Sequence, residues 1–122
     1  MFLKLDHQKL NVYLISRGFV FECYKLTKFF PSHEKFGMIQ QIRRAALSVH
    51  LNLAEGFSRK SEIERKRFFE ISRGSIIEVD AALDIAFDLK YLENANMENL
   101  GKSIVDCYKY TSGLIKASTK DG

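Results

Sequence analysis

The chain has 122 residues, of which 46% are apolar and 28% charged, and these proportions exclude an intrinsically disordered chain and indicate one folded domain. The formal net charge of +4 permits contact with nucleic acid or an anionic surface without establishing either. No segment approaches the roughly 18 apolar residues of a membrane span. The stretch from Met1 to Leu10 is too short and too charged for a signal peptide. We therefore expect a cytoplasmic protein in which Cys23 and Cys107 are reduced, buried thiols.

Apolar residues recur at helical spacing in four segments, and no hairpin signal separates alternating runs. The predicted helices cover about residues 10–30, 36–57, 62–90 and 97–117. The chain's one proline, Pro31, ends the first, and Gly56 lies where the C-cap of the second is expected. Ser61 followed by Glu64 fits a capping box at the start of the third. Short linkers force neighbouring helices to be antiparallel, so we predict an all-α, up-down-up-down four-helix bundle as a single domain over residues 1–122.

The second predicted helix has three distinct faces. Its core face holds Ile39, Ile42, Ala46, Val49 and Leu53. A narrow polar stripe holds Gln41, Arg44, Ser48, Asn52, Glu55 and Arg59. We hypothesise that Arg44 and Glu55 form a partly buried charged network, across a subunit contact or onto a neighbouring helix terminus. A second apolar face holds Leu47, Leu51 and Ala54, which a partner chain would bury; the alternative is that an aromatic side chain of the first helix covers Leu47 and Leu51.

Constellations typical of catalysis or metal binding are scarce. The histidines have no Cys or carboxylate at metal-ligand spacing, so we expect surface positions for His7, His33 and His50. Carboxylates four residues apart on the third helix fall opposite its core stripe, and a solvated acidic face is expected for Asp80, Asp84 and Asp88. No pair of nucleophile and base and no glycine-rich phosphate loop is present. We therefore expect no enzyme activity, no metal and no cofactor.

The positive charge is concentrated in one segment. Residues 43–73 contain eight Lys or Arg and four Glu, a surplus equal to the net charge of the whole chain. Two of these cations end the second helix and three open the third, so we expect one basic cluster of Arg59, Lys60, Arg65, Lys66 and Arg67. Cations near a helix N-terminus are unfavourable for its dipole, which suggests that Arg65 to Arg67 do not support the local fold. The cluster could bind phosphates or form an ordinary solvated surface, and nearby Phe57 and Phe69 could stack on bases or pack in the core.

Four runs of residues carry a resemblance to a known family: Lys25–Pro31, Gln41–Val49, Asn52–Gly56, and Arg73–Ser75 with Glu78. They resemble the bacterial four-helix bundle proteins encoded in intervening sequences of 23S ribosomal RNA genes, relatives of which are accessory proteins of diversity-generating retroelements. The resemblance covers about residues 10–118. It implies an antiparallel bundle that assembles into a ring, pentameric in relatives, without enzyme activity. It also implies association with RNA or DNA and, in the retroelement branch, with a reverse transcriptase.

Two functional interpretations follow. In the first, the chain is a non-catalytic homo-oligomer that binds structured nucleic acid through a basic rim. In the second, the ring is a protein-interaction scaffold with no role in nucleic-acid binding. Salt-dependent binding to generic RNA separates the two.

Overall fold

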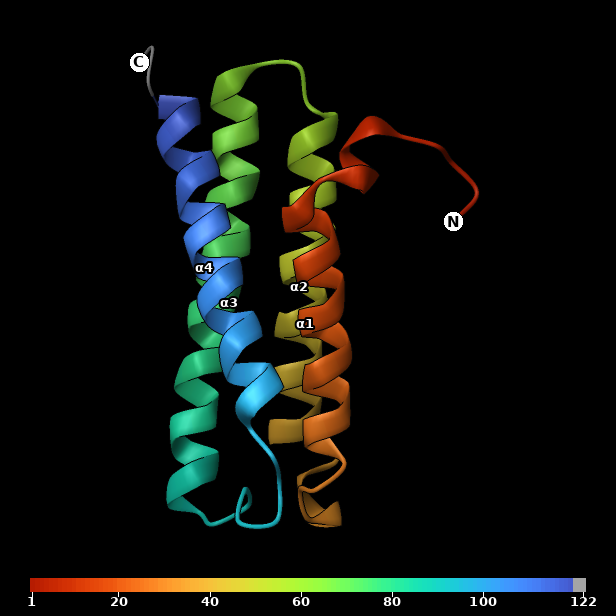
Figure 1. The fold of residues 1–122 in the computed structure, drawn as a ribbon. Helices are drawn as coiled ribbons and strands as arrows, with labels where there is room; N and C mark the ends of the chain where they lie inside the picture. The colour runs from red at the N-terminus through yellow and green to blue at the C-terminus, as the bar shows by residue number, and fades with distance from the viewer. Residues whose placement is uncertain (120–122) are drawn as a thin grey trace.

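The computed structural model describes residues 1–119, and they form four long helices and two short 3₁₀ turns (Figure 1). The helices are α1 (Asn11–Thr27), α2 (Met38–Ser58), α3 (Glu62–Asp88) and α4 (Glu98–Thr119). The turns are η1 (Asp6–Lys9), before α1, and η2 (Ser32–Glu34), between α1 and α2. The described residues contain no strand, and the prediction of an all-α fold is confirmed.

The four helices run alternately up and down and pack side by side as a bundle (Figure 1). Each helix packs against the next in the chain, and α4 returns to pack against α1, which closes the square. The predicted antiparallel four-helix bundle is therefore confirmed. Within the described part of the chain, no helix is long and apolar enough to cross a membrane.

The core is built from the predicted stripes. On α2, Ile42, Val49 and Leu53 are fully or almost fully buried, while Ile39 at the start of the face is only partly buried. Cys23 and Cys107 are also buried and unpaired with each other, as expected. Burial raises the pKa of both thiols to about 12, because a thiolate is poorly solvated in the apolar interior.

The first helix ends earlier than its apolar pattern indicates. We predicted a helix up to residue 30, but α1 ends at Thr27. Proline disfavours the helical conformation in the residue that precedes it, so the chain leaves the α-helix ahead of Pro31 through bonds of the i→i−3 type. Arg43 of α2 then caps this end: its Nε donates to Thr27 Oγ1 at 2.8 Å and its Nη2 donates to the Tyr24 carbonyl at 3.3 Å.

The end of α2 also differs from the prediction. Gly56 is not the C-cap, because α2 continues to Ser58. Gly56 is instead buried against α3, and a Cβ atom there would lie 2.6 Å from Cε1 of Phe69. The glycine is therefore required by the close approach of α2 and α3. The start of α3 is confirmed, since the Glu64 backbone N–H donates to Ser61 Oγ at 3.0 Å.

The loops at the other end of the bundle are joined by a tyrosine. Tyr91, in the connection between α3 and α4, donates from its hydroxyl to a carboxylate oxygen of Glu34 at 2.9 Å. The second carboxylate oxygen of Glu34 accepts from the Met38 backbone N–H at 3.1 Å and so caps α2. The bonds from Met38 and Tyr91 hold the pKa of Glu34 below its ordinary value. His33, exposed as expected, lies 3.3 Å from the Tyr91 hydroxyl.

Candidate nucleic-acid interface

The predicted basic cluster lies where α2 turns into α3. This turn is at the end of the bundle that also carries the last turn of α4 (Figure 1). We call this surface the basic end and define it by the five residues predicted from the sequence: Arg59, Lys60, Arg65, Lys66 and Arg67. The structure places all five there, but their surroundings divide them into two groups.

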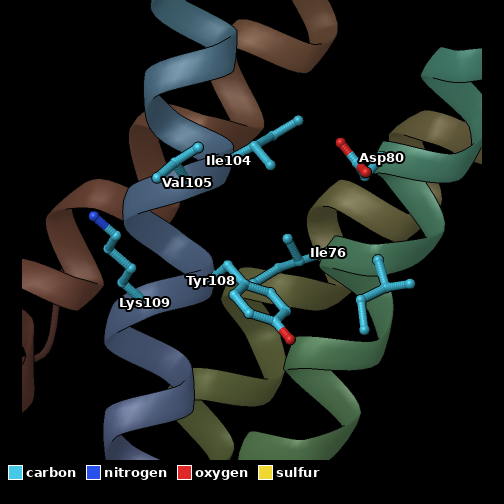
Figure 2. A pocket seen from close by; sticks show the side chains of 7 residues that line it. Ile76, Asp80, Ile104, Val105, Tyr108 and Lys109 are labelled. Carbon is cyan, nitrogen blue, oxygen red and sulfur yellow. The ribbon is translucent and has the colours of Figure 1, made fainter.

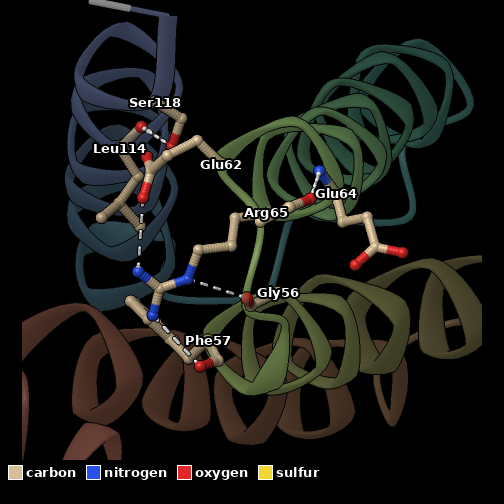
Figure 3. A network of polar contacts seen from close by, with 8 residues as sticks. Gly56, Phe57, Glu62, Glu64, Arg65, Leu114 and Ser118 are labelled. Carbon is tan, nitrogen blue, oxygen red and sulfur yellow. Dashed lines mark hydrogen bonds and ion pairs between the residues drawn. The ribbon is translucent and has the colours of Figure 1, made fainter. Parts of the chain in front are cut away.

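Arg65 has a structural role (Figure 3). It lies in the first turn of α3, where its Nε donates to the Gly56 carbonyl at 3.3 Å and its Nη2 donates to the Phe57 carbonyl at 3.1 Å. Its third nitrogen is 3.9 Å from the carboxylate of Glu62. The last carbonyls of a helix lack intrahelical donors, so this guanidinium caps α2 and complements its dipole. Arg65 therefore supports the local fold, contrary to the expectation drawn from the dipole of α3.

Arg59 is also engaged within the chain. One of its terminal nitrogens is 3.5 Å from a carboxylate oxygen of Glu55, one turn earlier. Its guanidinium lies over the ring of Phe68, 4.8 Å from the ring centroid. Part of its charge is therefore already offset before any ligand arrives.

The other three cations are available to a ligand. Lys60 and Arg67 are exposed and Lys66 is half-buried. None of the three forms a side-chain hydrogen bond or ion pair with another of residues 1–119. Lys60, Lys66 and Arg67 are therefore the part of the basic end that can neutralise an incoming anion.

The two phenylalanines beside the basic end pack against other rings. Phe69 is 2% exposed, and its ring centroid is 5.1 Å from that of Phe57. On its other side Phe57 stacks on His7 of η1, with the centroids 5.5 Å apart. Both phenylalanines thus pack in or against the core, and His7 already covers one face of the Phe57 ring.

The polar stripe of α2 faces α3. Ser48 Oγ accepts from Ser75 Oγ of α3 at 2.9 Å and from Asn52 Nδ2 at 2.9 Å. Arg44 is exposed, and Glu55 pairs with Arg59. Within one chain, therefore, Arg44 and Glu55 do not form the network that we hypothesised, and a contact across subunits stays a prediction.

The second apolar face of α2 is open in the single chain. Leu47 is 40% exposed and Leu51 is 54% exposed, while Ala54 is half-buried. Both leucines are thus partly covered within the single chain, and burial of the remainder by a partner chain stays a prediction. Beside this face, Tyr13 of α1 packs on His50, with their ring centroids 4.5 Å apart.

His50 is not the surface residue that we expected. It is half-buried, and its Nδ1 lies 2.7 Å from Ser16 Oγ of α1. Burial lowers the pKa of His50, and the nearby Arg17 and His7 lower it further. This histidine therefore joins α1 to α2 in its neutral form. Residues 1–119 contain no cluster of His, Cys, Asp or Glu that could hold a metal ion.

The capping arginines were missed by sequence reasoning. Arg43 and Arg65 each lie near the start of the helix that follows the one they cap. The sequence carried no signal for them, because the last turn of α1 contains Lys25 and that of α2 contains Gly56, so a local cap was available at each helix end.

Comparison with known proteins agrees with the resemblance noted in the sequence. The family model of the 23S rRNA-intervening sequence protein matches residues 8–113, from η1 to the last turns of α4. No curated protein matches the chain. Because the match spans most of the chain and all four helices, the chain belongs to the 23S rRNA-intervening sequence protein family.

Proposed function

We propose that this chain is a non-catalytic homo-oligomer that binds structured nucleic acid through phosphate contacts at its basic end. The observation that carries the proposal is the grouping of Lys60, Lys66 and Arg67 at one end of the bundle with no ion-pair partner among the described residues. Phosphate contacts made by such side chains are independent of sequence and release counterions from the nucleic acid.

Oligomerisation would multiply this charge. The exposed leucines of α2, Leu47 and Leu51, offer an apolar face that a second copy would bury. In a closed ring, pentameric if the family resemblance holds, the basic end would recur once in each copy and form a rim of positive potential. Several weak contacts on one nucleic acid would then reinforce one another.

Charge reversal tests the proposal. The variant Lys60→Glu/Lys66→Glu/Arg67→Glu should bind a fluorescently labelled RNA hairpin about tenfold or more weakly than the wild type in low salt. Arg65 is left unchanged because it caps α2. Fluorescence anisotropy gives the affinity, and sedimentation velocity checks that the oligomer is unaltered.

A matched control changes the same number of charges at the other end. Lys25→Glu/Lys28→Glu/Lys35→Glu alters the net charge equally, but its three lysines lie between the last turn of α1 and the start of α2. This control should retain the wild-type affinity to within a few-fold. Equal loss in both variants would mean that net charge alone, and not the basic end, attracts RNA. If the wild type binds no RNA in low salt, the proposal fails and the protein-interaction scaffold takes its place.

A further inference from the structure

An apolar groove runs along the seam between α3 and α4 (Figure 2). Its first part has a volume of about 310 Å³ and is lined by side chains that include Ile77, Val105 and Tyr108. These three side chains are exposed, with Val105 at 50%. A second hollow of about 250 Å³ shares Asp80 and Ile104 with the first and continues toward Phe87. The two hollows form one groove, and within the single chain its apolar floor is open to water.

The rim of the groove is acidic. Asp80 lines both hollows and Asp84 lines the second, and both carboxylates are exposed and form no ion pair within residues 1–119. Lys109 is the single cation that lines either hollow. The sequence predicted a solvated acidic face here, but not that it borders an apolar groove. The surface fits an apolar segment that carries positive charge.

The same chain carries such a segment. We call residues 1–5 the arm; it precedes η1 and reads Met-Phe-Leu-Lys-Leu. All five side chains are exposed, Phe2 to 89%, so four large apolar groups stand in water beside one lysine. Adjoining exposed apolar side chains of this kind form a candidate contact surface. The arm therefore lacks a partner within its own chain.

The arm and the groove match in length and in side-chain spacing. Five extended residues span about 17 Å. Along α3 the lining of the groove extends from Ile76 to Phe87, which at the helical rise is also about 17 Å. In an extended segment alternate side chains face opposite sides. Met1, Leu3 and Leu5 could therefore lie on the apolar floor while Lys4 points toward the acidic rim.

The arm cannot fill the groove of its own chain. It leaves the bundle beside α1 and α2, whereas α3 and α4 form the opposite side (Figure 1). Crossing the bundle means passing two helices of about 10 Å each, which is farther than the arm extends. The groove that receives it must then belong to another molecule.

We propose that residues 1–5 of one copy dock in extended form into the α3–α4 groove of a second copy. This inference deepens the proposed homo-oligomer and rests on it. Each copy supplies one arm and one groove, so the contact is head-to-tail and can close into a ring. The apolar floor supplies burial, and the pairing of Lys4 with Asp80 and Asp84 sets the direction of the arm.

Photo-crosslinking of the full chain tests the contact. The photo-crosslinker p-benzoylphenylalanine replaces Leu3, which is on the face of the arm assigned to the groove floor, and this protein is mixed with wild type uniformly labelled with ¹⁵N. After irradiation, mass spectrometry should find the unlabelled arm joined to ¹⁵N-labelled peptides that contain Ile77 or Val105. The matched control carries the same group at Phe36, which is also exposed but lies in the turn just before α2, at the other end of the bundle. It should give no crosslink to the groove.

Paired charge variants make the test more specific. Lys4→Glu should reduce the crosslinking yield several-fold, and adding Asp84→Lys in the acceptor copy should restore it. Val105→Asp, an exposed position whose change leaves the core intact, should abolish it.

The outcomes separate this inference from the proposed oligomer. A wild-type monomer at tens of micromolar, with no crosslink between copies, would overturn both. An oligomer whose arm crosslinks elsewhere, or only within its own chain, would overturn the arm–groove contact and leave the apolar face of α2 to hold the copies together. A groove that captures another protein but never the arm would overturn it as well.

Discussion

The close approach of α2 and α3 at Gly56 predicts opposite effects for the same substitution at different glycines. A Cβ added at Gly56 would lie 2.6 Å from Cε1 of Phe69, whose ring is buried, and 3.2 Å from Cβ of Phe68. Overpacking of this kind costs about 1–3 kcal/mol, and the better helix propensity of alanine returns at most about 1 kcal/mol. Gly56→Ala should therefore lower the free energy of unfolding by up to about 2 kcal/mol, the overpacking cost less the gain in helix propensity.

The matched controls are Gly74→Ala and Gly101→Ala. Both glycines lie within helices, and an added Cβ meets nothing within 4 Å at either. Each control should raise the free energy of unfolding by about 0.5–1 kcal/mol through helix propensity alone. Urea denaturation followed by circular dichroism measures all three variants. If Gly56→Ala is as stabilising as the controls, the packing argument for α2 and α3 is refuted.

Three further predictions concern the thiols, His50 and the apolar face of α2. Burial raises the pKa of both Cys23 and Cys107 to about 12, so a thiol reagent such as Ellman's reagent should react with them only as the protein unfolds. Rapid reaction of the native protein would contradict their burial. The folded-state pKa of His50 lies below the ordinary 6.5, so the unfolded chain binds the proton more readily. The free energy of unfolding should therefore fall as the pH drops below 6.5 and level off below the folded-state pKa. His50→Gln should lose this dependence in urea melts, and an unchanged profile would refute the assignment. If copies bury the apolar face of α2, Leu51→Asp should dissociate the oligomer in sedimentation velocity while helicity is retained. Ile63→Asp, at an exposed position outside that face, should leave the oligomer intact. An intact Leu51→Asp oligomer would contradict that interface.

The helices and the core were predictable because their signals are local. The apolar spacing of residues such as Ile42, Val49 and Leu53 follows the helical period, and these residues are buried. The start of α3 was also predictable, because Ser61 bonds an amide only three residues away. The caps at the ends of α1 and α2 were not, since Arg43 and Arg65 donate to Thr27 and to the Gly56 carbonyl from the next helix.

The location of the basic end was predictable from the sequence, but which of its cations are engaged within the chain was not. The sequence places five cations around one turn, yet only the structure shows that Arg65 caps α2 and that Arg59 pairs with Glu55. Glu55 was hypothesised to join a network with Arg44, across a subunit contact or onto a neighbouring helix terminus, and within one chain the helix provides a cation for Glu55 one turn away. The α3–α4 groove could not be read from the sequence, because its walls come from two helices whose relative rotation is set by packing.

The salt dependence of RNA binding tests the central claim most directly. For the wild type, the logarithm of the association constant should fall linearly with the logarithm of the salt concentration, with a slope of about −0.7 to −0.9 for each phosphate neutralised. Arg67→Ala should make this slope less steep by about that amount for every copy that touches the RNA, while Arg44→Ala, which removes an exposed arginine away from the basic end, should not change it. Equal slopes for wild type and Arg67→Ala, or wild-type binding that is independent of salt, would contradict phosphate recognition by the basic end.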